Sequence, residues 1–289
     1  MTTSPHVEAF FFDPATFTVS YVVHDPATLH AAIIDPVLDF TPRNARTSTA
    51  SADRLLAYVS EQRLSLQWLL ETHAHADHLS AAHYLRGKTG APIVIGAQIV
   101  EVQRTFAALF EADDVRADGS QFDRLVSDGD VLPLGDSAIR VLHTPGHTPA
   151  CVTYLIGDAA FVGDTLFMPD YGTARTDFPG GSAADLYRSI RTILALPDAT
   201  RIFVGHDYLP ESRQDFRWET TVAEQNADNV HIHDGVAEDD FVTLRRTRDA
   251  ALEAPLLILP SLQVNIRAGA LPPATAAGHV YLRLPVGAI

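Results

Sequence analysis

The stretch Thr72-His73-Ala74-His75-Ala76-Asp77-His78 places three histidines and an aspartate within six positions. It follows the largely apolar run 64–70, a pattern that predicts a buried strand. Buried polar groups without partners cost roughly several kcal/mol each, so these side chains are not expected to share an interior unless a positive charge pairs with them. A bound metal ion is the natural partner, and the stretch therefore predicts a metal site.

The composition is typical of a soluble enzyme-sized domain. The chain has 289 residues, of which 46% are hydrophobic and 20% are charged, which fits one large domain or a domain with an appendage. No apolar run approaches the roughly 20 residues that span a bilayer, and the polar N-terminus 1–5 lacks the features of a signal peptide. We therefore expect a cytoplasmic protein.

Net charge and cysteine content limit which classes of partner and which types of metal ligand are expected. The 21 basic and 36 acidic residues give a net charge of −15, which disfavours nucleic acid and anionic membranes as partners but allows a local basic pocket for an acidic small molecule. The single cysteine, Cys151, excludes a Cys-rich zinc site and leaves histidine and carboxylate as ligands. Cys151 starts a strand pattern, which favours a buried thiol over a nucleophile.

The order of predicted elements indicates two sheets with helices outside them. Residues 7–37 read as a strand meander with Asp-Pro pairs starting at Asp13, Asp25 and Asp35. A helix, strand, helix, strand, helix order follows, at 52–63, 64–70, 80–88, 92–95 and 100–110. A second β-rich region at 131–162 precedes an amphipathic helix at 184–196 and a buried strand at 201–204.

The C-terminal part differs in character. Residues 211–289 are more polar, contain helix-like runs at 215–226 and 239–253, and end in a Pro/Ala/Gly-rich tail. We expect a domain over 7–210 and a helical extension over 211–289 that packs on it, as a cap or as the contact of a homodimer. His231 and His233 lie in a polar stretch and are expected to be solvated.

Three further residues that can bind metal follow predicted strands: His147, Asp164 and His206. Loops at strand ends are where a layered α/β scaffold gathers reactive groups, so these side chains are expected to converge on the first cluster. A lone His or Asp after a strand is more often a cap or turn residue. Seven together favour a shared metal, because each would otherwise need its own partner.

The motif His-x-His-x-Asp-His, followed by His147, Asp164 and His206 in that order, resembles the metallo-β-lactamase superfamily over about residues 10–210. The resemblance implies an α+β fold, the αββα four-layer sandwich in which two sheets lie between helices. It also implies one metal site at His73, His75 and His147, and a second at Asp77, His78 and His206, with Asp164 between them. The superfamily includes both hydrolases and oxidoreductases, so the fold leaves the reaction open.

Segments after Asp164 are similar to the persulfide dioxygenase (sulfur dioxygenase) branch. They are Arg175-Thr176-Asp177-Phe178, Gly205-His206-Asp207-Tyr208 and the C-terminal pattern in 262–269. Thr173-Ala174-Arg175 departs from the Cys-Gly-Arg of the mitochondrial type, and 112–130 reads as an insertion. Both differences from the mitochondrial type fall where they would change the shape of the pocket that binds the thiol.

This resemblance implies one iron(II) per chain, held by His73, His147 and Asp164, with glutathione persulfide oxidised by O₂ to sulfite and thiol. Two histidines and a carboxylate leave coordination positions for substrate and O₂. Asp77 then joins these three at the reacting centre, and His75, Asp77, His78 and His206 support the iron or preserve a second metal site.

Three residues are candidates for substrate binding. Arg175 can bind a carboxylate in a bidentate manner, although an ion pair with Asp177 is equally expected. Tyr208 can donate a hydrogen bond to the glutathione backbone, or simply pack beneath the site. Thr148, next to His147, is a weaker candidate.

The alternative reaction is thioester hydrolysis of the glyoxalase II type. It needs two metal ions, such as zinc, and all seven ligands, and all seven are present in the sequence. Ligand identity alone therefore does not separate hydrolase from dioxygenase.

Overall fold

The computed structural model describes residues 4–12 and 16–287, so the predicted Asp-Pro turn at Asp13 lies outside the described residues. One six-stranded sheet in this part has the order β1-β2-β3-β6-β8-β9. Its strands are β1 (His6–Phe12), β2 (Thr18–His24), β3 (His30–Ile34), β6 (Ser65–Leu70), β8 (Ile93–Gly96) and β9 (Arg124–Val126). β1, β2 and β3 are antiparallel, and the remaining pairs are parallel.

A second six-stranded sheet follows in the sequence, with the order β10-β11-β12-β13-β14-β15. Its strands are β10 (Val131–Leu134), β11 (Ser137–His143), β12 (Val152–Ile156), β13 (Ala159–Phe161), β14 (Arg201–Phe203) and β15 (Glu219–Thr221). A small third sheet joins β5 (Arg46–Ser48), β4 (Val37–Thr41) and β7 (Leu79–Ser80).

Successive side chains along a strand belong to different hydrophobic cores, one between the two sheets and one outside each sheet. Val19, Tyr21 and Val23 of β2 lie in the core between the two sheets, whereas Val22 faces the opposite core. This is the two-residue period of a strand, in which successive side chains point to opposite faces. β12 has the same division: Tyr154 faces the inter-sheet core, and Leu155 faces outward toward helices.

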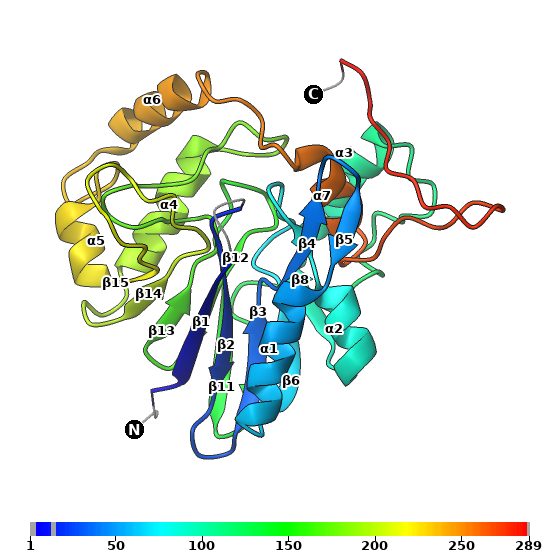
Figure 1. Cartoon of the computed structure of the whole chain (residues 1–289). Coiled ribbons are helices and arrows are strands. Elements are labelled where there is room, and N and C mark those ends of the chain that lie inside the picture. The colour runs from blue at the N-terminus through cyan, green and yellow to red at the C-terminus, as the bar shows by residue number, and fades with distance from the viewer. Residues whose placement is uncertain (1–3, 13–15, 288–289) are drawn as a thin grey trace.

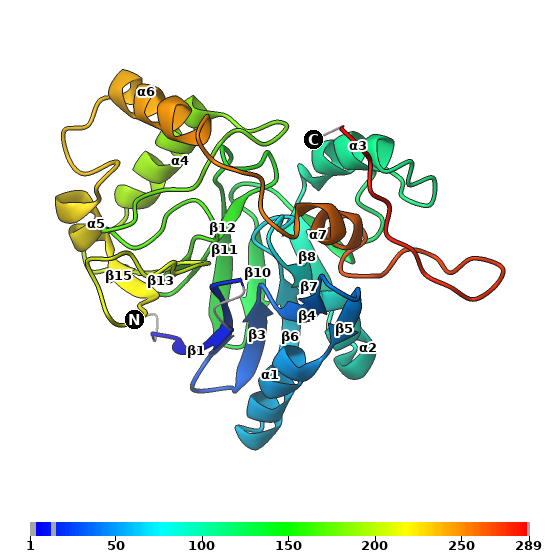
Figure 2. The same ribbon diagram turned by 45° about the horizontal axis from the view of Figure 1, so that its top comes forward.

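Helices cover the outer face of each sheet (Figures 1 and 2). The core outside the first sheet contains residues of α1 (Ala50–Glu61), α2 (Ala82–Thr89), α3 (Ile99–Leu109) and α7 (Ile258–Asn265). The core outside the second contains residues of α4 (Ala183–Leu194), α5 (Val222–Asp228) and α6 (Glu238–Asp249). The predicted α+β fold, an αββα sandwich, is confirmed.

One prediction about the helices in the C-terminal part is wrong, and one helix there was not predicted. The run 215–226 is not one helix, because Glu219–Thr221 pairs with β14 as β15 and α5 begins only at Val222. Thr221 and Glu224 form a capping box that fixes this start. The sequence reading also missed α7, which contains Pro260 in its first turn, where the missing N–H has no helical partner to lose.

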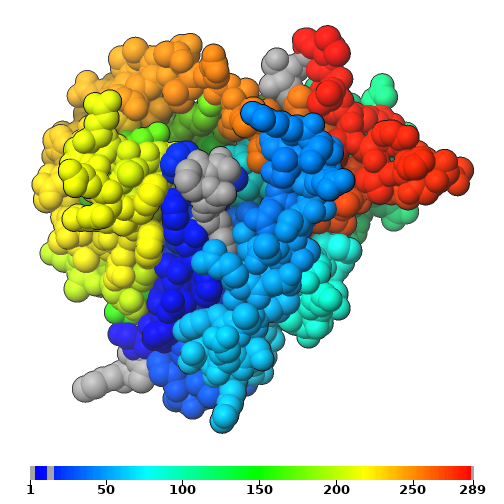
Figure 3. Space-filling model, in the orientation of Figure 1, coloured from blue at the N-terminus to red at the C-terminus, as the bar shows by residue number. Residues whose placement is uncertain are grey.

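Part of the chain between Gly269 and Arg283 projects from the body of the molecule, as the red segment in Figures 1 and 3 shows, and Arg283 then donates to the Phe110 carbonyl at 2.9 Å. Among residues 4–12 and 16–287, no helix has both the length and the apolar character needed to cross a bilayer.

Replacing Phe241 of α6 tests whether the C-terminal extension belongs to the main folding unit. Phe241 is fully buried, and its ring centroid lies 5.7 Å from that of Tyr187 in α4. Phe241→Ala should lower the free energy of unfolding by about 3–5 kcal/mol in one cooperative transition, measured by urea denaturation. The exposed neighbour Thr243 is the control, and Thr243→Ala should change the free energy of unfolding by less than about 1 kcal/mol. A separate early transition in Phe241→Ala would show that the extension folds independently.

Candidate metal centre

Loops from both sheets converge where their strands end. Residues 72–78 follow β6, His147 lies between β11 and β12, and Asp164 and His206 follow β13 and β14. The seven metal-binding side chains predicted from the sequence lie together and form two groups. Within each group, the ligand atoms lie within 4.8 Å of one another. The three-donor group is His73, His147 and Asp164, and the four-donor group is His75, Asp77, His78 and His206.

Hydrogen bonds from the backbone orient three of these imidazoles. The Nδ1 atom of His147 lies 2.8 Å from the Arg175 carbonyl oxygen. The Nδ1 atom of His206 lies 3.2 Å from the Thr16 carbonyl oxygen, and that of His78 lies 3.3 Å from the Leu79 carbonyl oxygen. A carbonyl only accepts, so each Nδ1 carries a proton, and in the neutral imidazole each Nε2 presents a lone pair.

His73 reaches the same state through a hydroxyl. The Thr72 hydroxyl has a single proton, which it donates to Asp35 Oδ2 at 2.7 Å. It therefore accepts a bond from His73 Nδ1, 3.0 Å away, and His73 Nε2 is left with a lone pair. Burial, and then the neighbouring imidazoles, hold the pKa of His73 well below its ordinary value. A neutral imidazole is the form that binds metal.

His75 is held in the opposite orientation. Its Nε2 lies 3.1 Å from Asp35 Oδ1 and 3.3 Å from Glu71 Oε2. Burial alone would lower the pKa of His75, but these two carboxylates outweigh burial and raise it well above the ordinary value. Because Nε2 faces these carboxylates, Nδ1 is the His75 atom available to the four-donor group, and it binds a metal only after losing its proton. Asp35, Glu71 and His75 also form a third group of possible ligand atoms within 4.8 Å of one another.

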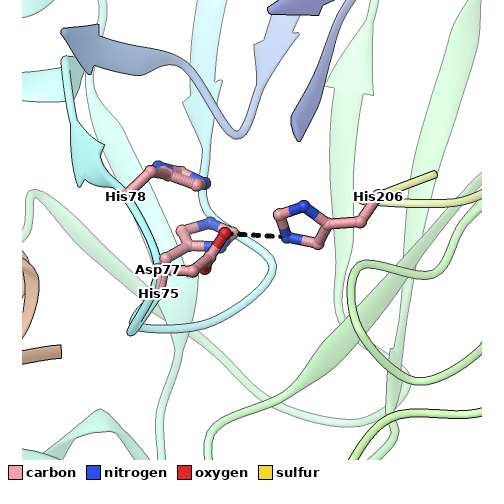
Figure 4. Close-up of side chains that lie close together, drawn as sticks. All are labelled: His75, Asp77, His78 and His206. Carbon is pink, nitrogen blue, oxygen red and sulfur yellow. Dashed lines mark ion pairs between the residues drawn. The ribbon is translucent and has the colours of Figure 1, made fainter. Parts of the chain in front are cut away.

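The inward-facing atoms lack hydrogen bonds. His206 Nε2 lies 3.3 Å from both Asp77 Oδ2 and Asp164 Oδ1, and Figure 4 shows it facing Asp77 from the opposite side of the site. Six atoms that face the site are among the buried side-chain atoms without a hydrogen-bond partner in the described residues: His73 Nε2, His75 Nδ1, His78 Nε2, His206 Nε2, Asp77 Oδ2 and Asp164 Oδ1. Lone pairs that face carboxylate oxygens repel, and a shared cation turns all of them into ligands. The donor set fits a metal.

A cavity of about 310 Å³ opens onto the three-donor group. His147, Asp164 and Asp77 lie on its wall, together with Tyr208 and Arg175. The Tyr208 ring stacks on that of His206, with centroids 5.4 Å apart, and among the described residues its hydroxyl has no hydrogen-bond partner. Both roles expected for Tyr208, packing beneath the site and donating to a ligand, fit this position.

Arg175 lines the cavity, but its guanidinium is already bonded. It forms a bidentate pair with Asp177, with both N···O distances 2.7 Å, and Nη1 donates to the Glu253 carbonyl at 2.6 Å. The ion pair that the sequence reading held as the alternative for Arg175 is therefore present. Arg248 on α6 also lines the cavity, is exposed, and pairs with no carboxylate in the described residues.

Thr148 does not line this cavity. Its hydroxyl lies 3.1 Å from Cys151 Sγ, so its position does not support the expected substrate contact. Cys151 is buried, as the sequence predicts, and burial raises the pKa of its thiol to about 12. A thiol in this state is a poor nucleophile.

The prediction that His231 is solvated is wrong, whereas His233 is exposed. His231 is buried, and its Nδ1 accepts a bond from Thr173 N at 3.0 Å beneath the cavity wall. Burial, and then Arg245, lower the pKa of His231 to about 4. Sequence reasoning also missed Arg245 and Arg248, whose i, i+3 spacing on a predicted helix was the available signal.

A family model described as the metallo-beta-lactamase superfamily matches residues 13–206. The chain belongs to this superfamily. Among superfamily relatives, a probable metallo-hydrolase of Burkholderia pseudomallei is 55% identical over 290 residues, covering 96% of this chain and 98% of the relative. A protein of Dictyostelium discoideum named glyoxylase B2 is 49% identical, with 93% of each chain covered. The human protein named persulfide dioxygenase ETHE1, mitochondrial, is 34% identical, covering 68% of this chain and 66% of its own.

Superfamily members also differ in length. The chain spans 65% to 66% of three β-lactamase hydrolase-like proteins that are 52% to 54% identical to it. The crystal structure of ETHE1 from Myxococcus xanthus superposes with a TM-score of 0.73 at 31% identity, covering 92% of this chain and 100% of that one.

Metal removal should destabilise the protein, because the inward-facing donors then repel one another. A metal present at about 1,000 times its Kd adds roughly 4 kcal/mol, so a strong chelator should lower Tm by at least about 5 °C in a thermal melt. Asp164→Ala is the control, because Asp164 lies close to both donor groups, and the chelator should shift its Tm far less. An unchanged Tm in the chelated natural protein would contradict a metal centre.

Proposed function

We propose that this chain is a persulfide dioxygenase that holds one iron(II) through His73, His147 and Asp164. The observation that carries the proposal is that these three side chains form a donor group of their own, with His147 and Asp164 on the wall of the cavity and His73 buried beside them. Two histidines and one carboxylate are the ligand set of non-heme iron oxygenases. Similarity to the human and Myxococcus xanthus ETHE1 proteins supports this assignment.

The substrate class is a small persulfide with an acidic group, such as glutathione persulfide. One persulfide, one O₂ and one water yield one thiol, one sulfite and two protons; the sulfur–sulfur bond breaks, and O₂ accepts the four electrons lost by sulfur. When bound, iron(II) supplies the site for O₂ reduction.

The chain's own residues bind and orient the substrate. Arg248, which has no carboxylate partner in the part of the chain that the structure describes, attracts a substrate carboxylate at the cavity. The Arg175 guanidinium is already bonded to the Asp177 carboxylate and the Glu253 carbonyl. The Tyr208 hydroxyl is free to donate to the substrate backbone. Asp77 lies on the cavity wall, 3.3 Å from His206 Nε2, where its carboxylate can accept the proton that the persulfide releases.

The four-donor group favours a second candidate function. His75, Asp77, His78 and His206 complete a two-metal site, in which two zinc ions would supply Lewis-acid chemistry for thioester hydrolysis. Relatives named metallo-hydrolase and glyoxylase B2 support this alternative.

The remaining parts of the proposal concern organisation and setting. We infer that the C-terminal extension belongs to one unit with the domain before it, because Phe241 packs in the same core as α4 and Leu262 in the same core as α3. The proposed substrates are aqueous small molecules and O₂, with no nucleic-acid or membrane partner. A cytoplasmic location and a homodimer remain predictions.

Metal analysis combined with oxygen uptake decides between the two reactions. Protein purified without oxygen should contain about one iron per chain, as a three-ligand site implies, and should consume O₂ only when glutathione persulfide is added. Two zinc ions per chain, with hydrolysis of S-lactoylglutathione and no O₂ uptake, would instead establish the hydrolase.

Replacing Arg248 tests carboxylate recognition. Arg248→Ala should raise KM for glutathione persulfide about tenfold with little change in kcat, because an ionic hydrogen bond of about 1.5 kcal/mol is lost from binding alone. Arg246→Ala is the matched control, since Arg246 is exposed on the same helix but does not line this cavity. Equal KM values for the two variants would remove Arg248 from the binding site.

A further inference from the structure

A single buried amide on α7 contacts the metal-binding loop at three points. Asn265 Nδ2 donates to the carbonyls of His75 and His78, both at 2.8 Å. Its Oδ1 accepts a bond from Ser80 N, also at 2.8 Å. The side chain is 4% exposed, and 187 and 190 positions of sequence separate it from the two histidines.

These bonds act on the backbone that carries four of the seven donors. One amide group holds the carbonyls of His75 and His78 in a fixed relation, and both side chains belong to the four-donor group. Buried carbonyls require partners, so without Asn265 the turn from His75 to His78 would have to rearrange to find others. A rearranged turn would misdirect His75 Nδ1 and His78 Nε2.

α7 is itself firmly anchored, so it can serve as a rigid support. Leu262 and Val264 are buried in the same core as Phe106 of α3. Gln103 Nε2 donates to the Ile266 carbonyl at 3.0 Å. Figure 2 shows α7 beside α3, β7 and β8.

The chain after α7 is pressed against the end of the same loop. At Gly269, with φ of +85°, a Cβ would lie 2.7 Å from the Ser80 carbonyl oxygen and 3.1 Å from His83 N. Only glycine allows this approach, which fixes the segment after α7 beside β7.

We propose that Asn265 is a positioning residue for the metal centre, through which the C-terminal segment holds the Thr72–His78 loop in its ligand-binding conformation. Nothing in this role depends on whether the reaction is oxidation or hydrolysis, since it rests on the metal site alone.

The chain offers a matched control two residues away. Gln263 is also a buried amide on α7 with three bonds, but it donates to the Leu259 and Arg283 carbonyls and accepts from Arg283 N. It ties the tail to the helix and makes no bond to the metal loop. Gln263→Ala therefore reports the cost of losing a buried amide on α7 without loss of the metal-loop contacts.

The test is the affinity of the metal-free full chain for Zn²⁺, measured by competition with a chelator in the absence of substrate. Asn265→Ala and Asn265→Asp should each bind at least one Zn²⁺ about 10- to 100-fold more weakly, and Co²⁺ added instead should show an altered absorption spectrum. Asn265→Asp keeps the shape and the acceptor for Ser80 N. Its carboxylate cannot donate to the His75 and His78 carbonyls and repels them, so weaker binding despite the added negative charge would show that these carbonyls need a donor. Gln263→Ala should bind as the natural protein does.

Zinc affinity equal to that of the natural protein in a folded Asn265 variant would overturn the proposal, as would an equal loss in Gln263→Ala. If neither Asn265 variant folds while Gln263→Ala does, Asn265 serves the fold as a whole and the positioning role is rejected. Because zinc and cobalt are used without persulfide, failure here leaves the proposed dioxygenation untouched, and failure of oxygen uptake leaves this result standing.

Discussion

The structure of the centre depends on one electrostatic requirement: lone pairs of imidazoles and oxygens of carboxylates face one another, and only a cation between them makes the arrangement favourable. His206 Nε2 lies 3.3 Å from oxygens of Asp77 and Asp164, and His73 and His147 lie 3.8 and 3.7 Å from the other Asp164 oxygen. Such a cluster opposes folding of the metal-free chain. The apolar cores on both sides of the two sheets must compensate for this repulsion.

The scaffold fixes the donors before any metal arrives. Each imidazole is bonded from behind, by a carbonyl, a hydroxyl or a carboxylate, so its free nitrogen points inward. Two glycines allow the loops to approach this closely. At Gly146, with φ of +138°, a Cβ would lie 2.3 Å from Leu186 N, and at Gly163, with φ of +51°, 2.4 Å from Thr72 Oγ1. Each glycine directly precedes a donor residue, His147 or Asp164, so close packing and ligand placement share the same turns.

The fold class and the metal-binding residues could be predicted from local sequence patterns, because both depend on short spacings between residues and on the positions where strands end. The burial of His231 could not be predicted, since its partners Thr173 and Arg245 are distant in the sequence and meet it only through tertiary packing. α7 was missed because Pro260 and the Pro/Ala/Gly-rich flank resemble a tail, while its stability comes from packing on α3. Arg175 and Asp177 lie two residues apart, so their ion pair could be anticipated, whereas the unpaired state of Arg248 could not.

The superfamily match ends at residue 206, yet the site extends beyond it. α6 contributes Arg245 and Arg248 to the cavity wall, and α7 contributes Asn265 behind the metal loop. Because hydrolases and oxidoreductases of this superfamily share the donor pattern, the donors by themselves do not select the reaction. Selection must instead come from the shape and charge of the cavity and from how rigidly the second group of donors is held. In this chain, residues after 206 contribute to both.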